Sequence, residues 1–105
     1  MVVDGVTGGW DPQTGILQDG NEAQIDQAFK NVELAITTAG GAGWSQVYRM
    51  TSYHVGVSSQ VMQAMVRNFK KYFPDHEPLW TCIGVAGLAR PDMTVEIEAV
   101  AHVPN

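Results

Sequence analysis

The sequence has few cations. Only six of its 105 residues are Lys or Arg, against eleven Asp or Glu, and the formal net charge is −5 at pH 7. Binding to nucleic acid requires several phosphate contacts from cations, and the field of an acidic chain opposes the approach of a polyanion. The same charge opposes docking on an anionic membrane surface. We therefore expect neither a nucleic-acid partner nor a membrane partner.

Cysteine and long apolar runs are also scarce. Cys82 is the sole cysteine, so no disulfide can form within the chain, which is typical of a reducing compartment. No apolar run is long enough to span a bilayer, and no basic segment followed by an apolar one marks a leader. These absences predict a cytoplasmic protein. A mitochondrial location stays open, because a cleaved transit peptide leaves no trace.

The chain does contain enough apolar material for a core. Hydrophobic residues make up 45% of it and charged residues 16%, a balance that excludes wholesale disorder. The length suits one domain over residues 1–105. A domain of this size leaves part of its apolar surface poorly covered as a monomer, and association with further copies is a common remedy.

Hydrophobic periodicity predicts an α+β domain with six elements in the order β-α-β-α-β-β. The expected strands cover residues 2–6, 47–55, 79–86 and 93–103, and the expected helices run from 21 to 40 and from 58 or 59 to 73. The apolar face expected for the first helix is Ile25, Phe29, Val32 and Ile36. The apolar face expected for the second helix is Met62, Met65, Val66, Phe69 and Phe73. Two helices of this length can cover only one face of a four-stranded sheet.

The strand over 79–86 is apolar on both faces. We assign one of its two alternating sets to the face without helices, where the simplest cover is another copy of the protein. That set is Trp80, Cys82, Gly84 and Ala86.

The last strand alternates cleanly between apolar and acidic residues. We expect Val95 and Ile97 to pack against the helices, and Glu96 to lie on the free face beside the strand that carries Trp80.

Five segments resemble the RidA/YjgF family, also labelled endoribonuclease L-PSP, in order and spacing. They are Gly9-Trp10-Asp11-Pro12-Gln13-Thr14-Gly15, the helix over 27–40, the strand over 47–55, Lys71-Tyr72-Phe73-Pro74, and Val95-Glu96-Ile97-Glu98-Ala99-Val100-Ala101. A first family strand, before the segment over 5–7, has no counterpart here. The resemblance implies a chorismate-mutase-like fold with a mixed sheet and two helices on one face. It also implies a homotrimer whose clefts, between subunits, hydrolyse enamines and imines to keto acids and ammonia without a cofactor.

Trp80 departs from the family pattern. Family deaminases carry an arginine in the strand motif Pro-x-Arg-x-Cys, where it clamps the substrate carboxylate. Pro78-Leu79-Trp80-Thr81-Cys82 has a neutral indole with one N–H donor at that place. The resemblance therefore predicts deaminase chemistry that is weakened or altered.

The sequence offers one candidate catalytic residue and five candidate ligand-binding residues, of which Glu96 and Cys82 match residues of the family cleft. Glu96 matches the family glutamate that positions water; the alternative is a solvated strand face. The binding candidates are Thr7, Trp10, Trp80, Cys82 and Arg90. Trp80 and Cys82 have an alternative role as packing residues, and Arg90 as a solvated charge in a turn that could also replace the lost arginine.

Three functions are compatible with the sequence. The first is a RidA-like homotrimer that binds a small metabolite, such as a keto acid, an enamine or imine, or an apolar ligand. The second is an active enamine or imine deaminase, and the third a non-catalytic regulatory trimer. RNA cleavage is disfavoured by the charge. The three histidines lack the spacing of metal ligands, so we expect no metal and no cofactor.

Overall fold

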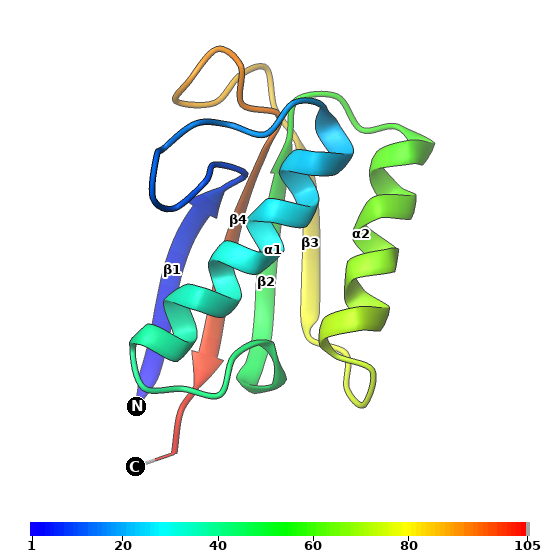
Figure 1. Ribbon diagram of the computed structural model, residues 1–105. Coiled ribbons are helices and arrows are strands. Elements are labelled where there is room, and N and C mark those ends of the chain that lie inside the picture. Colours follow the sequence, from blue (N-terminus) through cyan, green and yellow to red (C-terminus); the bar gives the residue numbers. More distant parts are fainter. Residues whose placement is uncertain (105) are drawn as a thin grey trace.

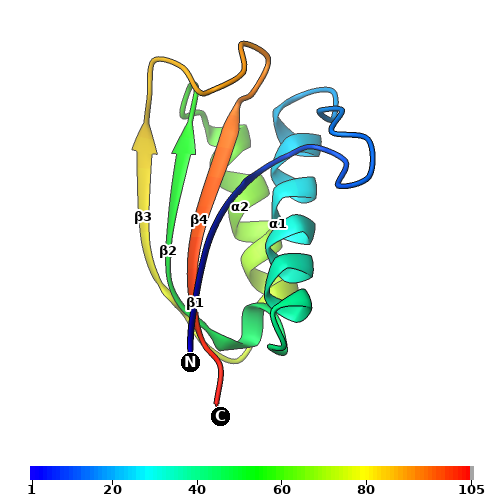
Figure 2. The same cartoon turned by 90° about the vertical axis from the view of Figure 1, so that its left-hand side faces the viewer.

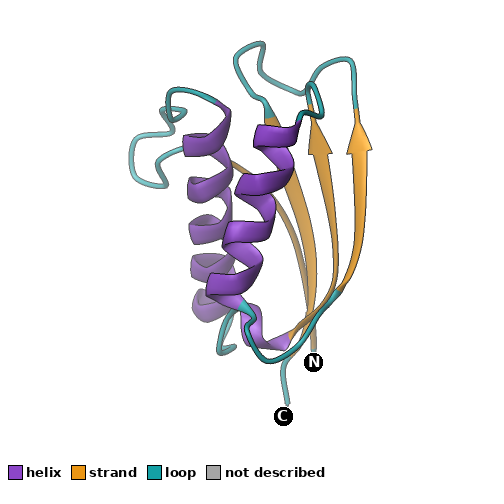
Figure 3. Cartoon of the chain, turned by 90° about the vertical axis from the view of Figure 1, so that its right-hand side faces the viewer, coloured by secondary structure: helices purple, strands orange, loops and turns teal. Residues whose placement is uncertain are grey.

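The order of the elements in a computed structural model, which describes residues 1–104, is the predicted one. The chain forms β1 (Val2–Gly8), α1 (Asn21–Thr38), a short 3-10 turn η1 (Trp44–Gln46), β2 (Val47–His54), α2 (Ser59–Tyr72), β3 (Leu79–Gly84) and β4 (Val95–His102). Both helices lie on one side of the sheet (Figures 1 and 3), as predicted. Neither helix within residues 1–104 is long and apolar enough to cross a membrane.

The sheet is mixed, and its strand order is β1-β4-β2-β3. β2 and β3 are parallel and are joined through α2, whereas β4 pairs antiparallel with both β1 and β2. β4 and β2 are thus the central strands. β1 and β3 form the two edges.

The core lies between the sheet and the helices. The predicted apolar face of α1 is confirmed, because Ile25, Phe29, Val32 and Ile36 are all buried. Phe29 stacks on Trp44 with ring centroids 4.8 Å apart, and the Trp44 indole donates a hydrogen bond to the Phe29 carbonyl over 2.9 Å. These contacts fix α1 against the turn that leads into β2.

The second helix begins as predicted, and its predicted apolar face is confirmed in part, because Met65 and Phe73 are buried and Phe69 packs against the core. Ser58 caps it by accepting a hydrogen bond from the backbone N–H of Val61. Val61 and Ala64 are buried, whereas Val66, expected in the core, is 40% exposed. Asn68, which was not expected in the core, is buried and donates to Asp26 of α1 over 2.8 Å.

Strand register corrects the assignment of faces in β3. Val95 and Ile97 are buried on the helix side, as predicted, and they pair with His54 and Ser52 of β2. Ser52 in turn pairs with Cys82. Paired residues point to the same face of a sheet.

The prediction that Trp80, Cys82 and Gly84 lie on the free face is therefore wrong. All three face the helices, and Ala86 lies beyond the end of β3. Both sets of alternating residues in this strand are apolar, so the pattern alone could not distinguish them.

Candidate functional site

The free face of the sheet carries Glu96, the predicted catalytic residue. We call this surface the open face, because no helix covers it (Figure 2). Register assigns to it the side chains of Val2, Asp4, Val6, Arg49, Thr51, Tyr53, Leu79, Thr81, Ile83, Glu96, Glu98, Val100 and His102.

Glu96 lies in the middle of one row across the open face. Its paired neighbours are Tyr53 of β2 and Gly8 of β1, and Ile83 lies beyond Tyr53. Directly opposed side chains on one face have Cβ atoms about 4.5–5.5 Å apart. Glu96 and Tyr53 are both half-buried, and neither side chain hydrogen-bonds to another group within residues 1–104. A carboxylate and a phenol thus lie side by side and are free to contact a ligand.

A second row of side chains, two residues along each strand, also contains carboxylate and hydroxyl groups. Glu98 pairs with Thr51 of β2 and Val6 of β1, and Thr81 follows on β3. The centre of the open face is therefore a strip of two carboxylates and three hydroxyls, counting Tyr53. Carboxylates exchange protons and hydroxyls orient water, so this strip can support acid–base chemistry.

Arg49 is remote from Glu96 within the same subunit. Arg49 also belongs to the open face, but it lies four residues before Tyr53 on β2. At the rise of an extended strand that separation is roughly 13 Å. A ligand carboxylate beside Glu96 would not contact Arg49.

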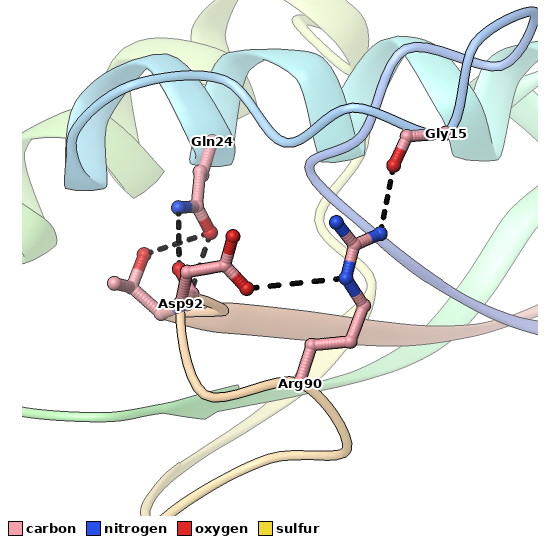
Figure 4. A network of polar contacts seen from close by, with 5 residues as sticks. Gly15, Gln24, Arg90 and Asp92 are labelled. Atoms are coloured by element: carbon pink, nitrogen blue, oxygen red, sulfur yellow. Dashed lines mark hydrogen bonds and ion pairs between the residues drawn. The ribbon is translucent and has the colours of Figure 1, made fainter.

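The Arg90 side chain is held by contacts with the loops at one end of the sheet. Its Nη1 donates to the Gly15 carbonyl over 2.7 Å, and its Nε lies 3.9 Å from Asp92 (Figure 4). Gln24 holds the same loop by accepting from the Thr94 N–H over 2.9 Å and donating to the Asp92 carbonyl over 3.0 Å. Arg90 is therefore a clamp between two loops rather than a simple solvated charge, and its side chain is 41% exposed.

Of the two candidates from the start of the chain, Trp10 lies at the same end of the sheet as Glu96, whereas Thr7 lies on the opposite face. Thr7 pairs with the buried Ile97, so it faces the helix side. The Trp10 ring fills the space beside Gly8, where an added Cβ would lie 2.6 Å from it. Because Gly8 pairs with Glu96, Trp10 lies at the same end of the sheet.

Trp80 and Cys82 are separated from Glu96. They face the helices from β3, and β2 lies between β3 and β4. The Trp80 ring meets Phe69 of α2 edge-on, with centroids 4.7 Å apart, and its indole N–H donates to Ser52 Oγ over 2.9 Å. The prediction that Glu96 lies beside the strand carrying Trp80 is wrong.

Sequence reasoning missed the residues behind Trp80. Ser52 and His54 are almost fully buried, and His54 Nε2 lies 2.9 Å from Ser52 Oγ. Burial lowers the pKa of His54. Its Nδ1 has no hydrogen-bond partner within residues 1–104. The Ser-x-His spacing puts both on one strand face, but the sequence did not show that this face would be buried next to an indole.

Comparison with known proteins decides the family. The model of the family described as Endoribonuclease L-PSP matches residues 2–103. This chain belongs to that family, which is also called RidA/YjgF. The chain is a divergent member: it is 29% identical over 98 residues to the RutC family protein YjgH of Escherichia coli, covering 89% of this chain and 72% of YjgH.

Several solved structures share the fold of this chain. A probable translation initiation inhibitor from Rhodopseudomonas palustris has a TM-score of 0.87 at 26% identity, covering 99% of this chain and 80% of that one. RidA from the Antarctic bacterium Psychrobacter gives 0.86 at 24%, covering 97% and 80%. TdcF of E. coli, solved with bound serine, gives 0.85 at 22%, covering 99% and 81%. The two lower identities support the fold alone.

Proposed function

We propose that this chain forms a RidA-type homotrimer that binds a small metabolite between subunits, beside Glu96, and that its imine-deaminase chemistry is weakened or altered. Family membership supports the assembly and the class of ligand. One observation supports the expectation of weakened or altered deaminase chemistry. Trp80 stands at the place of the family arginine, and its one N–H donates a hydrogen bond within the subunit, to Ser52.

The open face supports association with further copies. Val6, Leu79 and Ile83 are 56%, 73% and 37% exposed there. Apolar side chains gathered on one face around a polar strip are typical of an interaction surface. A neighbouring subunit on this face would exclude water from Glu96 and Tyr53. The small ligand would then meet a carboxylate and a phenol in a partly dry cleft.

The missing cation explains why we expect slow deamination. Hydrolysis of 2-aminoacrylate needs a group that holds the substrate carboxylate in the transition state. A charge-assisted hydrogen bond of this kind contributes about 1.5–3 kcal/mol. Trp80 supplies no charge, and Arg49 lies too far along the strand. Glu96 can still orient water, which is the part of the family chemistry that this chain retains.

An active deaminase is the second candidate, and the position of Arg90 favours it. The Gly15 carbonyl fixes its guanidinium at the loop end of the sheet, and its Nη2 makes no hydrogen bond within residues 1–104. A substrate carboxylate that reached this end of a cleft would find a pre-oriented cation.

A coupled assay with 2-aminoacrylate separates these functions. The proposal predicts slow release of keto acid and ammonia that Glu96→Gln abolishes, because Gln keeps the shape and loses the proton chemistry. Asp4→Asn removes a carboxylate from the same face but four residues along the sheet from Glu96, opposite Val100; it is the matched control and should retain the activity. Ordinary turnover that Arg90→Gln destroys would replace the proposal with the second candidate. No hydrolysis and no binding of keto acids by the wild-type trimer would indicate a non-catalytic regulatory protein.

A further inference from the structure

The charges of the chain are unevenly distributed between α2 and the rest of the molecule. α2 carries Arg67, Lys70 and Lys71, which are half of the six cations, and no acidic residue. Its formal charge is therefore +3 and that of the remaining residues is −8, because the whole chain has −5. A cationic helix on an acidic protein produces a local positive potential, which attracts acidic groups.

The solvent side of α2 has a hollow whose lining, within residues 1–104, comes from this helix alone. The hollow has a volume of about 510 Å³, and its lining, which we call the α2 surface, consists of Met62, Gln63, Val66, Arg67 and Lys70. A site for a small molecule encloses most of its ligand between several walls. The side chains of one helix cannot do this. The hollow therefore suits a larger partner that brings the second wall itself.

The residues of the α2 surface have the spacing that a second helix can follow. Met62, Val66 and Lys70 succeed one another at intervals of four residues. Gln63 and Arg67 form a neighbouring row with the same interval. Such rows are ridges on a helix surface, and the ridge of a second helix packs into the groove between them. Met62 adds a flexible thioether, which adapts to the shape of a partner.

The two cations of the α2 surface can both receive a carboxylate. Arg67 donates from Nη2 to Asp26 of α1 over 2.8 Å, which fixes the guanidinium and leaves its other N–H groups without a partner within residues 1–104. Lys70 forms no ion pair within the same residues. An acidic partner can therefore contact each cation without breaking a bond inside the chain.

We propose that the α2 surface binds an acidic amphipathic helix of a partner protein. Met62 and Val66 contact its apolar side chains, and Arg67 and Lys70 contact its carboxylates, in the manner of a helix laid along a groove. The α2 surface and the open face lie on opposite sides of the sheet (Figure 3), so further copies on the open face leave α2 accessible. The inference requires neither the trimer nor chemistry at Glu96.

Titration of ¹⁵N-labelled protein with a synthetic peptide tests the α2 surface directly. The peptide is an amphipathic helix of about 15 residues, long enough for a helix to persist in water, with Leu on one face and Glu on the other. We expect saturable shifts of the backbone amides over 62–70, none over 95–102, and weaker binding as the salt concentration rises. The same peptide with Lys in place of each Glu should not bind. Absence of saturable shifts over 62–70, or equal binding of the Lys peptide, would overturn the proposal.

Two pairs of matched substitutions separate the α2 surface from the overall charge of the protein. Lys70→Gln should weaken binding of the acidic peptide roughly threefold, the equivalent of one exposed ion pair, whereas Lys30→Gln on α1 removes the same charge and should leave binding unchanged. Val66→Ser should also weaken binding severalfold, whereas Leu34→Ser on α1 should not. Val66 and Leu34 are 40% and 49% exposed, and both lysines are exposed, so all four variants should fold. Equal effects within either pair would contradict the proposal.

Two other occupants of the α2 surface would each overturn the proposal. Shifts over 62–70 that grow with protein concentration alone mean that a second copy covers the helix. Sedimentation of the protein with vesicles of phosphatidylserine and phosphatidylcholine, together with no binding of the acidic peptide, means that the α2 surface contacts a membrane.

Discussion

The two faces of the sheet are built from the same strands and differ in what covers them. On the helix face, Ile97 and Met50 are buried by the chain's own helices, and the polar Ser52 and His54 bond to each other. On the open face, Glu96 and Glu98 lie between exposed apolar side chains. The difference teaches that alternation alone defines two faces, whereas helices of the same chain close only one of them.

Substitutions of two isoleucines, one on each face, should show the largest difference between the faces in the free energy of unfolding. Ile97, on the helix face, is 0% exposed, whereas Ile83, on the open face, is 37% exposed. Ile97→Ala removes buried methyl groups and leaves a cavity, so we expect it to lower the free energy of unfolding by about 2–5 kcal/mol. Urea denaturation measures the loss.

Ile83→Ala should differ from Ile97→Ala in its effect on the stability of a subunit and in its effect on the association of subunits. We expect a loss of less than about 1 kcal/mol in the free energy of unfolding of a subunit, together with weaker association of subunits. Similar losses of subunit stability for both variants, with association unaffected, would mean that the two faces do not differ in this way.

Ser52→Ala tests the difference between the faces at a polar position of the helix face. The substitution leaves the Trp80 N–H without an acceptor in a partly buried site and removes the partner of His54 Nε2. An unsatisfied buried group costs about 1–3 kcal/mol. Thr51→Ala, next to it but on the open face, should change the free energy of unfolding by less than about 0.5 kcal/mol. Equal effects in thermal or urea unfolding would show that the Ser52–Trp80 bond contributes nothing.

The pH dependence of the free energy of unfolding should show a smaller difference between a histidine on the helix face and one on the open face. Burial lowers the pKa of His54 below its ordinary value of 6.5, so the unfolded chain binds the proton more readily. The free energy of unfolding should therefore fall as the pH drops below about 6.5, by at most about 1.4 kcal/mol per pH unit from this residue. His54→Gln should remove this component.

The control for this titration is a histidine on the other face. His102 is exposed on the open face, and His102→Gln should leave the acid-side dependence as it is in the unchanged protein. Urea midpoints measured from pH 7.5 down to about 5 provide the comparison. The same dependence in His54→Gln and in the unchanged protein contradicts the role given to burial.

The sequence was sufficient to predict the order of the helices and strands, and to predict which side chains of β4 face the helices. The 3.6-residue periodicity of α1 and the clean alternation of β4 each leave one arrangement that buries the apolar set, and both were predicted correctly. The alternation of β4 by itself therefore assigns Glu96 to the open face. The segments that resemble the family were sufficient to identify it.

The sequence was insufficient where two faces of one element were equally apolar. In β3 both sets of side chains could have been buried, and the choice depended on how β3 pairs with β2. The contacts of this pairing join residues distant in sequence. For the same reason, the alignment of Ser52 and His54 with Trp80 could not be inferred from their spacing.

The central claim is that the open face is a boundary between subunits, and the molar mass in solution tests it most directly. Multi-angle light scattering of the unchanged protein at micromolar concentration should give about 34 kDa, three times the chain mass of 11.4 kDa. Ile83→Glu, which adds a carboxylate beside Tyr53 and Glu96, should shift the mass toward one chain. Leu34→Glu, at a similarly exposed position on α1, should not. A mass near 11 kDa for the unchanged protein, or a trimer that persists in Ile83→Glu, would contradict the assignment of the open face.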